Sequence, residues 1–584
     1  MREAREQMKT TAAPRRTGRA GGSGPARAGR VTRARAWING PLADRLSVGH
    51  RRIPPRRIVR WIAVGVAVAV PSLALGVATA TADANLGPHA ARYDVTLDHE
   101  ITVDVGPLGT LVIDSPLPLM LGARVVVQEI PSEITAVEAT GTLEELGEDL
   151  DRYVQFFAAP EATITVVARA LVIDALRRAL FAAVLTVLVI LGLRAALGPQ
   201  RRGELAAGMR PHAGLLVGGG SVVVMVLATL TASVPLGADS SRERVASSVF
   251  DDTPLEGARI TGRLAGIIDT YGGYAVDAYW DNQRFYDDAT SAVREAWARQ
   301  EALQAEIARL RSADPSLPAT EEPEDGATEP VVMLVVSDLH CNVGMVPVIR
   351  EVAELAGADI VLNAGDSTVN GTSVESYCVT AFAGAVPDGA VQVVADGNHD
   401  SPETANQERS VGAHVLDGQV IEVAGVRILG DADPRATRIG TGTVQRGEES
   451  VADISRRLAD VACEDPDGVD LLLVHDPLMG NASLEEGCVP AQVSGHMHRR
   501  LGPVWHGNGT RYVSSSTAGA RLGQPTVGPL NGVAELTVLR FDPDSRRIVD
   551  YRLVRVHPDT DASVGAWLDW PGEPLAPTPR NGRL

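Results

Sequence analysis

Three long apolar runs stand out along the chain, at residues 61–82, 179–197 and 213–236. A helix that crosses a membrane needs about 20 consecutive and mainly apolar residues. Each run meets that requirement, and only the second contains a charged residue, Arg194. The pattern therefore predicts three transmembrane helices, at residues 58–82, 179–197 and 213–236. The alternative for each run is a helix that is buried in the core of a soluble protein.

The stretches around these runs predict soluble parts of different kinds. Residues 83–170 alternate between apolar and polar positions, as in YDVTLDHEITVDV, which predicts a small β-rich domain. Residues 238–329 contain a charged amphipathic helix, which we expect to form a stalk, and then an acidic, proline-rich linker. The apolar residues of that helix follow near-heptad spacing: Ala296, Leu303, Ile307 and Leu310. Residues 561–584 read as a proline-rich tail.

Residues 330–560 show strand-like runs that alternate with helical periodicity. VVMLVVSDLH and ADIVLNAGD are two such runs, and MVPVIREVAELA between them has the periodicity of a helix. This order predicts an α/β domain, in which functional groups collect at the carboxyl ends of the strands. Five of the runs end in side chains of the kinds that bind metal ions: Asp338 and His340; Asp366; Asn398, His399 and Asp400; His475; His496 and His498.

Each of these short motifs has an ordinary explanation when it is taken alone. A histidine at a strand end is commonly structural, and Gly-Asn suits a turn with positive φ. The order and spacing favour a metal site instead. Asp366 lies 28 residues after Asp338 and 32 before Asn398, and His496 and His498 face the same side of an extended segment. Oxygen and imidazole ligands of this kind suit Mn, Fe or Zn.

Taken together, the motifs resemble those of the calcineurin-like metallophosphoesterase superfamily. They are Asp-x-His, Gly-Asp, Gly-Asn-His-Asp, a lone His and Gly-His-x-His, in that order, within residues 330–540. The resemblance implies a four-layer αββα sandwich that holds two divalent metal ions, with Asp366 bridging them. The other ligands that it implies are Asp338, His340 and His498 for one ion, and Asn398, His475 and His496 for the other.

The resemblance also implies a reaction, the hydrolysis of a phosphate mono- or diester by metal-bound hydroxide. A bound metal ion lowers the pKa of its water from about 15.7 towards 7, which provides hydroxide near neutral pH. His399 would stabilise or protonate the leaving group, and Asp400 would orient His399. Two more aspartates, Asp431 and Asp433 in RILGDADPR, either line the substrate pocket or lie in a solvated loop.

The distribution of charge predicts how the chain is oriented in a membrane. Residues 1–60 carry 16 Lys and Arg against three acidic residues, a local balance of +13 that leaves −32 for the rest of a chain whose total is −19. Basic segments stay on the cytoplasmic side, so we expect a disordered cytoplasmic tail at residues 1–57 and a cytoplasmic loop at 198–212. Residues 83–170 and the C-terminal half then lie outside. Arg177 and Arg178, just before the second span, oppose this orientation.

A cleaved signal peptide is the alternative for the first span, because the small residues of ATATADA suit cleavage. Both alternatives leave the C-terminal half outside. The net charge of −19 argues against specific binding of nucleic acid by the chain as a whole. Binding of nucleic acid by the basic tail remains an alternative.

Four cysteines, Cys341, Cys378, Cys463 and Cys488, all lie in the α/β region, and no two form a CxxC motif. An even number in an oxidising compartment suggests two disulfides, for which three pairings exist. Neighbouring positions in the predicted domain favour Cys341–Cys378, which leaves Cys463–Cys488. The alternative is four free thiols in a cytoplasmic domain, and it requires the opposite topology.

These features together predict a multi-pass protein of the cell membrane that hydrolyses phosphate esters on the extracytoplasmic side with two metal ions. The alternative is a membrane sensor or scaffold that uses the phosphoesterase fold as a binding module. A transporter fits less well, because the three spans offer no pairs of charges within the membrane.

Overall fold

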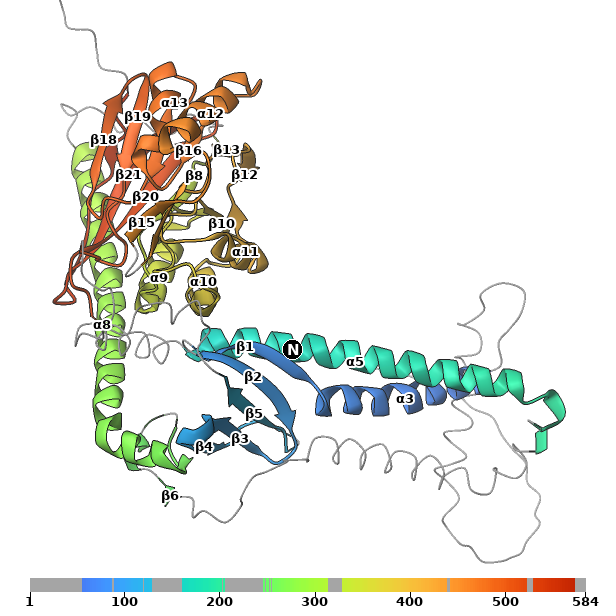
Figure 1. The fold of residues 1–584 in the computed structure, drawn as a ribbon. Helices are drawn as coiled ribbons and strands as arrows, with labels where there is room; N and C mark the ends of the chain where they lie inside the picture. The colour runs from blue at the N-terminus through green and yellow to red at the C-terminus, as the bar shows by residue number, and fades with distance from the viewer. Residues whose placement is uncertain are drawn as a thin grey trace, which may run out of the picture. The chain divides into compact units, whose positions relative to one another are not determined.

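The computed structural model describes residues 55–128, 160–204, 245–313, 328–438, 442–521 and 529–572, except for residues 87–88, 119, 202, 247, 252 and 254 (Figure 1). The chain divides into two units, residues 1–72 with 183–219 and residues 73–182 with 220–584. The predicted third span, residues 213–236, lies outside the described residues, as do residues 1–54 of the tail.

Two long helices contain stretches that are apolar enough to cross a membrane. They are α3 (Pro55–Ala78) and α5 (Pro160–Ala196), and the stretches are Trp61–Ala78 and Ile164–Ala196. Large apolar side chains on both helices are exposed, among them Trp61, Phe181 and Leu188. Exposed apolar side chains along a helix are what contact with lipid requires.

The first part of α5 packs on a sheet and therefore belongs to a folded domain. Val167 lies in a small core with Ala82, Tyr93 and Val125. The Asp174 carboxylate accepts the backbone N–H of Thr81 at 2.9 Å and pairs with Arg178 at 2.6 Å. The charge of Arg178, which opposed the predicted orientation, is thus matched by a carboxylate one turn away.

The sheet under α5, sheet A, combines strands from two distant parts of the chain. Its order is β1-β2-β5-β3-β4-β7-β6. The strands are β1 (Thr81–Leu86), β2 (His89–Thr96), β3 (Glu100–Asp104), β4 (Thr110–Asp114), β5 (Gly122–Val127), β6 (Val245–Ala246) and β7 (Arg259–Ile260). The β-rich region therefore differs from the predicted 83–170, because it takes its last two strands from residues that follow α5.

Two further sheets face each other across an apolar core. Sheet B has the order β11-β10-β9-β8-β20-β21-β22, with β23 beside β21, and sheet C has the order β12-β13-β16-β17-β19-β18. Sheet B comprises β8 (Val331–Val336), β9 (Ile360–Asn363), β10 (Val391–Val394), β11 (His414–Val415), β20 (Ala534–Asp542), β21 (Arg547–Val556), β22 (Ala562–Val564) and β23 (Leu568–Asp569). Sheet C comprises β12 (Ile421–Val423), β13 (Val426–Leu429), β16 (Leu471–Leu473), β17 (Ala491–Ser494), β18 (Leu501–His506) and β19 (Gly509–Val513).

Alternate side chains of each strand face opposite layers. Met333 and Val335 of β8 point into the core between the sheets, whereas Leu334 and Val336 pack under helices on the outer face of sheet B. Leu472 of β16 packs in the same way against helices on the outer face of sheet C. The result is a helix–sheet–sheet–helix arrangement of mixed α/β sheets. Its helices are α9 (Val346–Ala356), α10 (Ser376–Ala383), α11 (Pro402–Ser410), α12 (Val451–Glu464) and α13 (Asn481–Glu486).

The helix expected to be a stalk instead forms part of this domain. α8 (Arg263–Ala313) follows β7 after two residues and runs along the sandwich, where Tyr286, Val293 and Trp297 are buried in the core of sheet B (Figure 1). Leu303 and Leu310, on the stripe seen in the sequence, are 53% and 55% exposed. β22 and β23 likewise extend sheet B into residues assigned to the tail.

Candidate metal centre

The predicted ligands follow strands that end at one edge of the two sheets. β8, β9 and β10 are parallel neighbours in sheet B, and β16 and β17 are parallel neighbours in sheet C. Parallel neighbours bring their carboxyl ends to the same edge. The segments after these five strands carry Asp338 and His340, Asp366, Asn398 to Asp400, His475, and His496 with His498.

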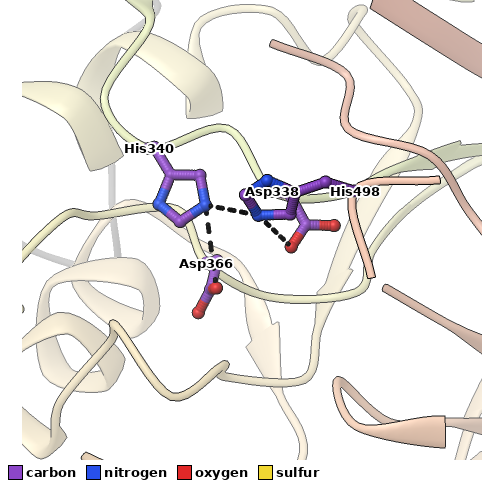
Figure 2. Close-up of side chains that lie close together, drawn as sticks. All are labelled: Asp338, His340, Asp366 and His498. Carbon is purple, nitrogen blue, oxygen red and sulfur yellow. Dashed lines mark hydrogen bonds and ion pairs between the residues drawn. The ribbon is translucent and has the colours of Figure 1, made fainter. Parts of the chain in front are cut away.

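The first cluster contains Asp338, His340, Asp366 and His498, whose ligand atoms all lie within 4.8 Å of one another (Figure 2). His340 Nε2 lies 3.1 Å from His498 Nε2, and His498 Nε2 lies 3.4 Å from Asp338 Oδ1. Asp366 Oδ2 lies 3.8 Å from His340 Nε2. Four donor atoms from three strand ends thus converge on one point.

The second cluster contains Asp366, His475 and His496, again within 4.8 Å. His475 Nε2 lies 3.1 Å from Asp366 Oδ2 and 3.2 Å from His496 Nδ1. The Oδ1 atom of Asn398 is 3.1 Å from the same His475 nitrogen. Asp366 is therefore common to both clusters, and Asn398 adds a neutral oxygen to the second.

These donor atoms fit divalent metal ions. The imidazole nitrogens of each cluster face one another and a carboxylate, an arrangement that suits a cation between them. Imidazole and carboxylate ligands are those that Mn, Fe and Zn accept. His475 donates Nδ1–H to the Ala364 carbonyl at 2.6 Å, which turns Nε2 towards the cluster, as metal-binding histidines require.

Asp366 is oriented by the backbone of a neighbouring loop. Its Oδ1 accepts the backbone N–H of His399 at 2.8 Å, which leaves Oδ2 facing both clusters. A Cβ atom at Gly397 would overlap Asp366 Oδ1, and one at Gly495 would overlap the hydroxyl of Ser337. The glycines of the Gly-Asn-His-Asp and Gly-His-x-His motifs are therefore needed for the close approach of these loops.

The ligand loops adopt backbone conformations that side chains rarely take. Positive φ angles occur at five of the predicted ligands and at the cysteine beside His340: Asp338 (52°), His340 (41°), Cys341 (58°), Asp366 (58°), His496 (73°) and His498 (51°). Each such residue costs on the order of 1 kcal/mol or more, and such costs concentrate at functional sites. The surrounding fold therefore holds these side chains in place against their local preference.

Burial and neighbouring charges set the protonation of the ligands in the metal-free protein. Burial lowers the pKa of His340 to about 4, although the Asp366 charge opposes the shift. Burial acts in the same way on His475, but the charge and hydrogen bond of Asp366 outweigh it and raise that pKa to about 10. Burial disfavours the charged form of Asp366, yet the histidines, His475 foremost, hold its pKa well below the usual range. A metal ion that bound here would therefore compete with a proton on His475.

His399 and Asp400 lie beside the clusters but do not pair with each other as expected. His399 Nδ1 lies 2.6 Å from the Val369 carbonyl, and its ring centroid is 4.9 Å from that of His340. The Asp400 carboxylate accepts backbone N–H groups of Asp366 and Gly397, both at 2.8 Å. Asp400 thus joins the two ligand loops, and a backbone carbonyl orients His399 instead.

The structure places Asp431 and Asp433 in salt bridges, and the burial of Asp433 rules out a solvated loop for that residue. Asp433 is fully buried and pairs with Arg435 at 2.7 Å, and Asp431 pairs with Arg457 at 2.7 Å. Both carboxylates are therefore occupied by arginines in salt bridges that support the fold. Thr437, in the hairpin after them, contacts Asn398 across 39 residues, and no motif in the sequence signals this contact.

The cysteines form two disulfides with the pairing that the sequence favoured. Cys341 pairs with Cys378, and Cys463 pairs with Cys488, with Cα atoms 5.1 and 5.0 Å apart. The first disulfide joins the residue after His340 to α10. The second joins α12 to the residues after α13.

Residues 331–500 match the family model of the calcineurin-like phosphoesterase, so this part of the chain is a domain of that family. No curated protein matches the chain significantly. Solved structures similar to it include an archaeal phosphodiesterase, with 12% identity over 39% of this chain and 100% of that one and a TM-score of 0.25. The NAD nucleotidase of Haemophilus influenzae shares 15% identity over 42% and 54% of the two chains (TM-score 0.26). A purple acid phosphatase from yellow lupin shares 15% over 43% and 54% (TM-score 0.28). These low TM-scores add nothing to the family match.

Proposed function

We propose that this chain is a membrane-anchored hydrolase that cleaves phosphate mono- or diesters with two divalent metal ions. The observation that carries the proposal is the position of Asp366 Oδ2, which lies between the nitrogens of His340 and His475 and so belongs to both clusters. The family match of residues 331–500 supports the same reaction class.

When bound, the two ions would supply Lewis acidity that neutralises phosphate oxygens and lowers the pKa of a water molecule. The protein's own part is to hold the ligands and to move a proton. His399 is suited to the second task, because the Val369 carbonyl holds its Nδ1–H and leaves Nε2 free beside the His340 ring. In its protonated form, His399 would donate from Nε2 to the leaving-group oxygen.

Membrane anchoring is supported by α3 and α5 and by the strand pairing of sheet A. Leu111 of β4 pairs with Ile260 of β7, so residues on either side of α5 share one sheet. If α3 and α5 each cross the membrane, the chain has to cross it once more between residues 196 and 245 to complete that sheet. We propose the predicted span at 213–236 for this crossing.

The orientation that we propose places the phosphoesterase domain on the extracytoplasmic side. The basic residues before α3 favour a cytoplasmic N-terminus. The two disulfides support the same orientation, since disulfides persist in oxidising compartments. Labelling of thiols in intact cells tests this proposal: cysteines that react without reductant, and only after lysis, would contradict it.

The proposed reaction is tested by hydrolysis of p-nitrophenyl phosphate and bis(p-nitrophenyl) phosphate. The full chain in detergent is loaded with Mn²⁺, Fe²⁺ or Zn²⁺ and compared with the variant Asp366→Asn. Asp388→Asn is a matched control, because Asp388 is exposed in the loop before β10, at the opposite end of that strand from the ligands. Metal-dependent turnover that only Asp366→Asn loses is the expected result. Folded, metal-loaded protein without turnover on either ester would favour the sensor or scaffold instead.

A further inference from the structure

A separate two-stranded hairpin lies against the loop that carries Asn398. It consists of β14 (Arg435–Arg438) and β15 (Gly442–Gln445), which pair only with each other among the described strands. Its base is anchored by Arg435, which pairs with Asp433 at 2.7 Å and with Asp476 at 2.5 Å. Asp476 follows the ligand His475, so the hairpin is connected to both sides of the second cluster.

Thr437 of this hairpin holds both the backbone and the side chain of Asn398. Its backbone N–H donates to the Asn398 carbonyl at 2.8 Å. Its Oγ1 accepts from Asn398 Nδ2 at 2.7 Å. The side-chain amide of an asparagine can be turned over, which exchanges its oxygen and nitrogen. Because Asn398 Nδ2 donates to Thr437, Asn398 Oδ1 faces the second cluster and lies 3.1 Å from His475 Nε2. In this position the oxygen can serve as a metal ligand.

A second threonine helps Thr437 to act as the acceptor. The Oγ1 atoms of Thr437 and Thr443 lie 2.8 Å apart, and the two residues are partners in the strand register. When the Thr437 hydroxyl donates to Thr443, its lone pairs are free for Asn398 Nδ2.

Two arginines, Arg438 of the hairpin and Arg446 directly after it, hold the carbonyls of the same loop. Arg438 donates to the carbonyls of His399 at 2.9 Å and Asp400 at 3.1 Å. Arg446 donates to those of Gly397 and Asn398, both at 3.1 Å. Every carbonyl from Gly397 to Asp400 thus accepts a hydrogen bond from a charged guanidinium group, which fixes the backbone of this loop. The contact with Thr437 then decides which way the side-chain amide of Asn398 is turned.

We infer that Thr437 is a positioning residue that directs the oxygen of Asn398 at the second metal site. This inference rests on the proposed two-metal function and adds a residue that touches no ligand atom of the first cluster. Partners of metal ligands typically change metal affinity by roughly 10- to 100-fold when they are removed. Removing the Thr437 hydroxyl should therefore lower the affinity for the second ion by that factor and leave the affinity for the first ion unchanged.

The test is a titration of the metal-free full chain with Mn²⁺, with free Mn²⁺ followed by electron paramagnetic resonance. Thr437→Val removes the hydroxyl with little change of shape, and Thr437→Ala does so without adding a methyl group. Thr437→Ser restores the acceptor. Val444→Ala is the control, because Val444 lies in the same hairpin and is 57% exposed, and the substitution leaves both threonine hydroxyls in place.

The expected result is a second Mn²⁺ bound roughly 10- to 100-fold more weakly in Thr437→Val and Thr437→Ala. Thr437→Ser and Val444→Ala should retain both affinities, and turnover should follow occupancy of the second site. If a folded Thr437→Val or Thr437→Ala variant binds both ions as the parent chain does, the inference is wrong while the proposed function stands. If the parent chain binds no second ion, both are wrong.

Discussion

The Oδ2 atom of Asp366 lies 3.1 Å from Nε2 of His475, and this contact joins the two sheets of the sandwich at their shared edge. Asp366 follows β9 of sheet B, and His475 follows β16 of sheet C. The same oxygen also approaches His340, which follows β8. Any change that moves this carboxylate should therefore affect both halves of the proposed centre.

Gly397→Ala should displace Asp366 without removing a ligand. The added Cβ would overlap Asp366 Oδ1, which is the oxygen held by the backbone N–H of His399. We expect metal occupancy and turnover to fall at least about tenfold, since misplacement of a site by an ångström has effects of that size or larger. Metal content and initial rates of the purified variant measure the effect.

Gly447→Ala is the control for this variant, because a Cβ there meets no atom within 4 Å and its backbone needs no positive φ. It should retain full metal content and rate. Equal metal content in the two variants would show that the loop tolerates the displacement.

The disulfide beside His340 should affect metal binding, whereas the second should affect stability alone. Replacing Cys341 and Cys378 by serine releases the residue next to a ligand from α10. Replacing Cys463 and Cys488 releases a bridge between α12 and the residues after α13. Each removal should cost about 2–4 kcal/mol in the free energy of unfolding.

Thermal unfolding and metal titration of both double variants distinguish the two roles. We expect similar losses of stability, but weaker metal binding only in the Cys341→Ser/Cys378→Ser variant. Unchanged metal affinity in that variant would contradict the role that we assign to the first disulfide.

A buried pair of carboxyl groups should make the metal-free domain lose stability as the pH rises. Burial raises the pKa of Asp396 to about 7, and burial with the neighbouring Asp396 raises that of Glu408 well above its usual range. Asp396 Oδ1 and Glu408 Oε2 find no donor among the described residues, so a proton held by one of the two carboxyl groups offers the missing hydrogen bond.

A carboxyl group with a raised folded pKa binds its proton more tightly in the folded state. The protonated Asp396 contributes fully to the free energy of unfolding below pH 3.8, which is its pKa in the unfolded chain. That contribution is lost as the pH rises through about 7, which is its pKa in the folded protein. One such proton changes the free energy of unfolding by up to about 1.4 kcal/mol per pH unit. Glu408→Gln supplies a permanent N–H donor, so its stability relative to the parent should grow between pH 4 and pH 7. Denaturant unfolding of the metal-free proteins across that range measures this, and a constant difference would contradict it.

The packing of α3 on α5 should depend on a small residue. A Cβ at Gly76 would overlap the backbone oxygen of Ala175 and crowd Ala179. Gly76→Ala should therefore destabilise the full chain in detergent by about 1–3 kcal/mol, because the helices have to separate. Gly65→Ala lies on the same helix with no atom within 4 Å and should have no such effect. Equal melting temperatures for the two variants would contradict the close packing.

The sequence predicted that these side chains would gather at one edge, because each follows a strand end and the strands bring their ends together. It did not predict the packing of α8. The apolar stripe that suggested a stalk consists of Ala296, Leu303, Ile307 and Leu310, and only Ala296 of these is buried. The buried face of the helix otherwise uses residues outside the stripe, among them the aromatic Tyr286 and Trp297. Helical periodicity identifies an apolar face without identifying what covers it.

Contacts between segments far apart in the chain could not be predicted from the sequence either. β6 and β7 join sheet A after more than 100 intervening residues, and Thr437 reaches Asn398 from a hairpin with no recognisable motif. The expected pairing of Asp400 with His399 failed because five N–H and O–H donors of neighbouring residues already occupy that carboxylate.

The number of metal ions that the full chain holds decides whether the site is a two-metal centre. The chain in detergent is loaded with Mn²⁺, desalted and analysed by elemental mass spectrometry beside Asp366→Asn, with circular dichroism to establish that both are folded. We expect two ions per parent chain and the loss of at least one in Asp366→Asn, because both clusters share that carboxylate. One ion or none in the parent chain, or two in the variant, would contradict it.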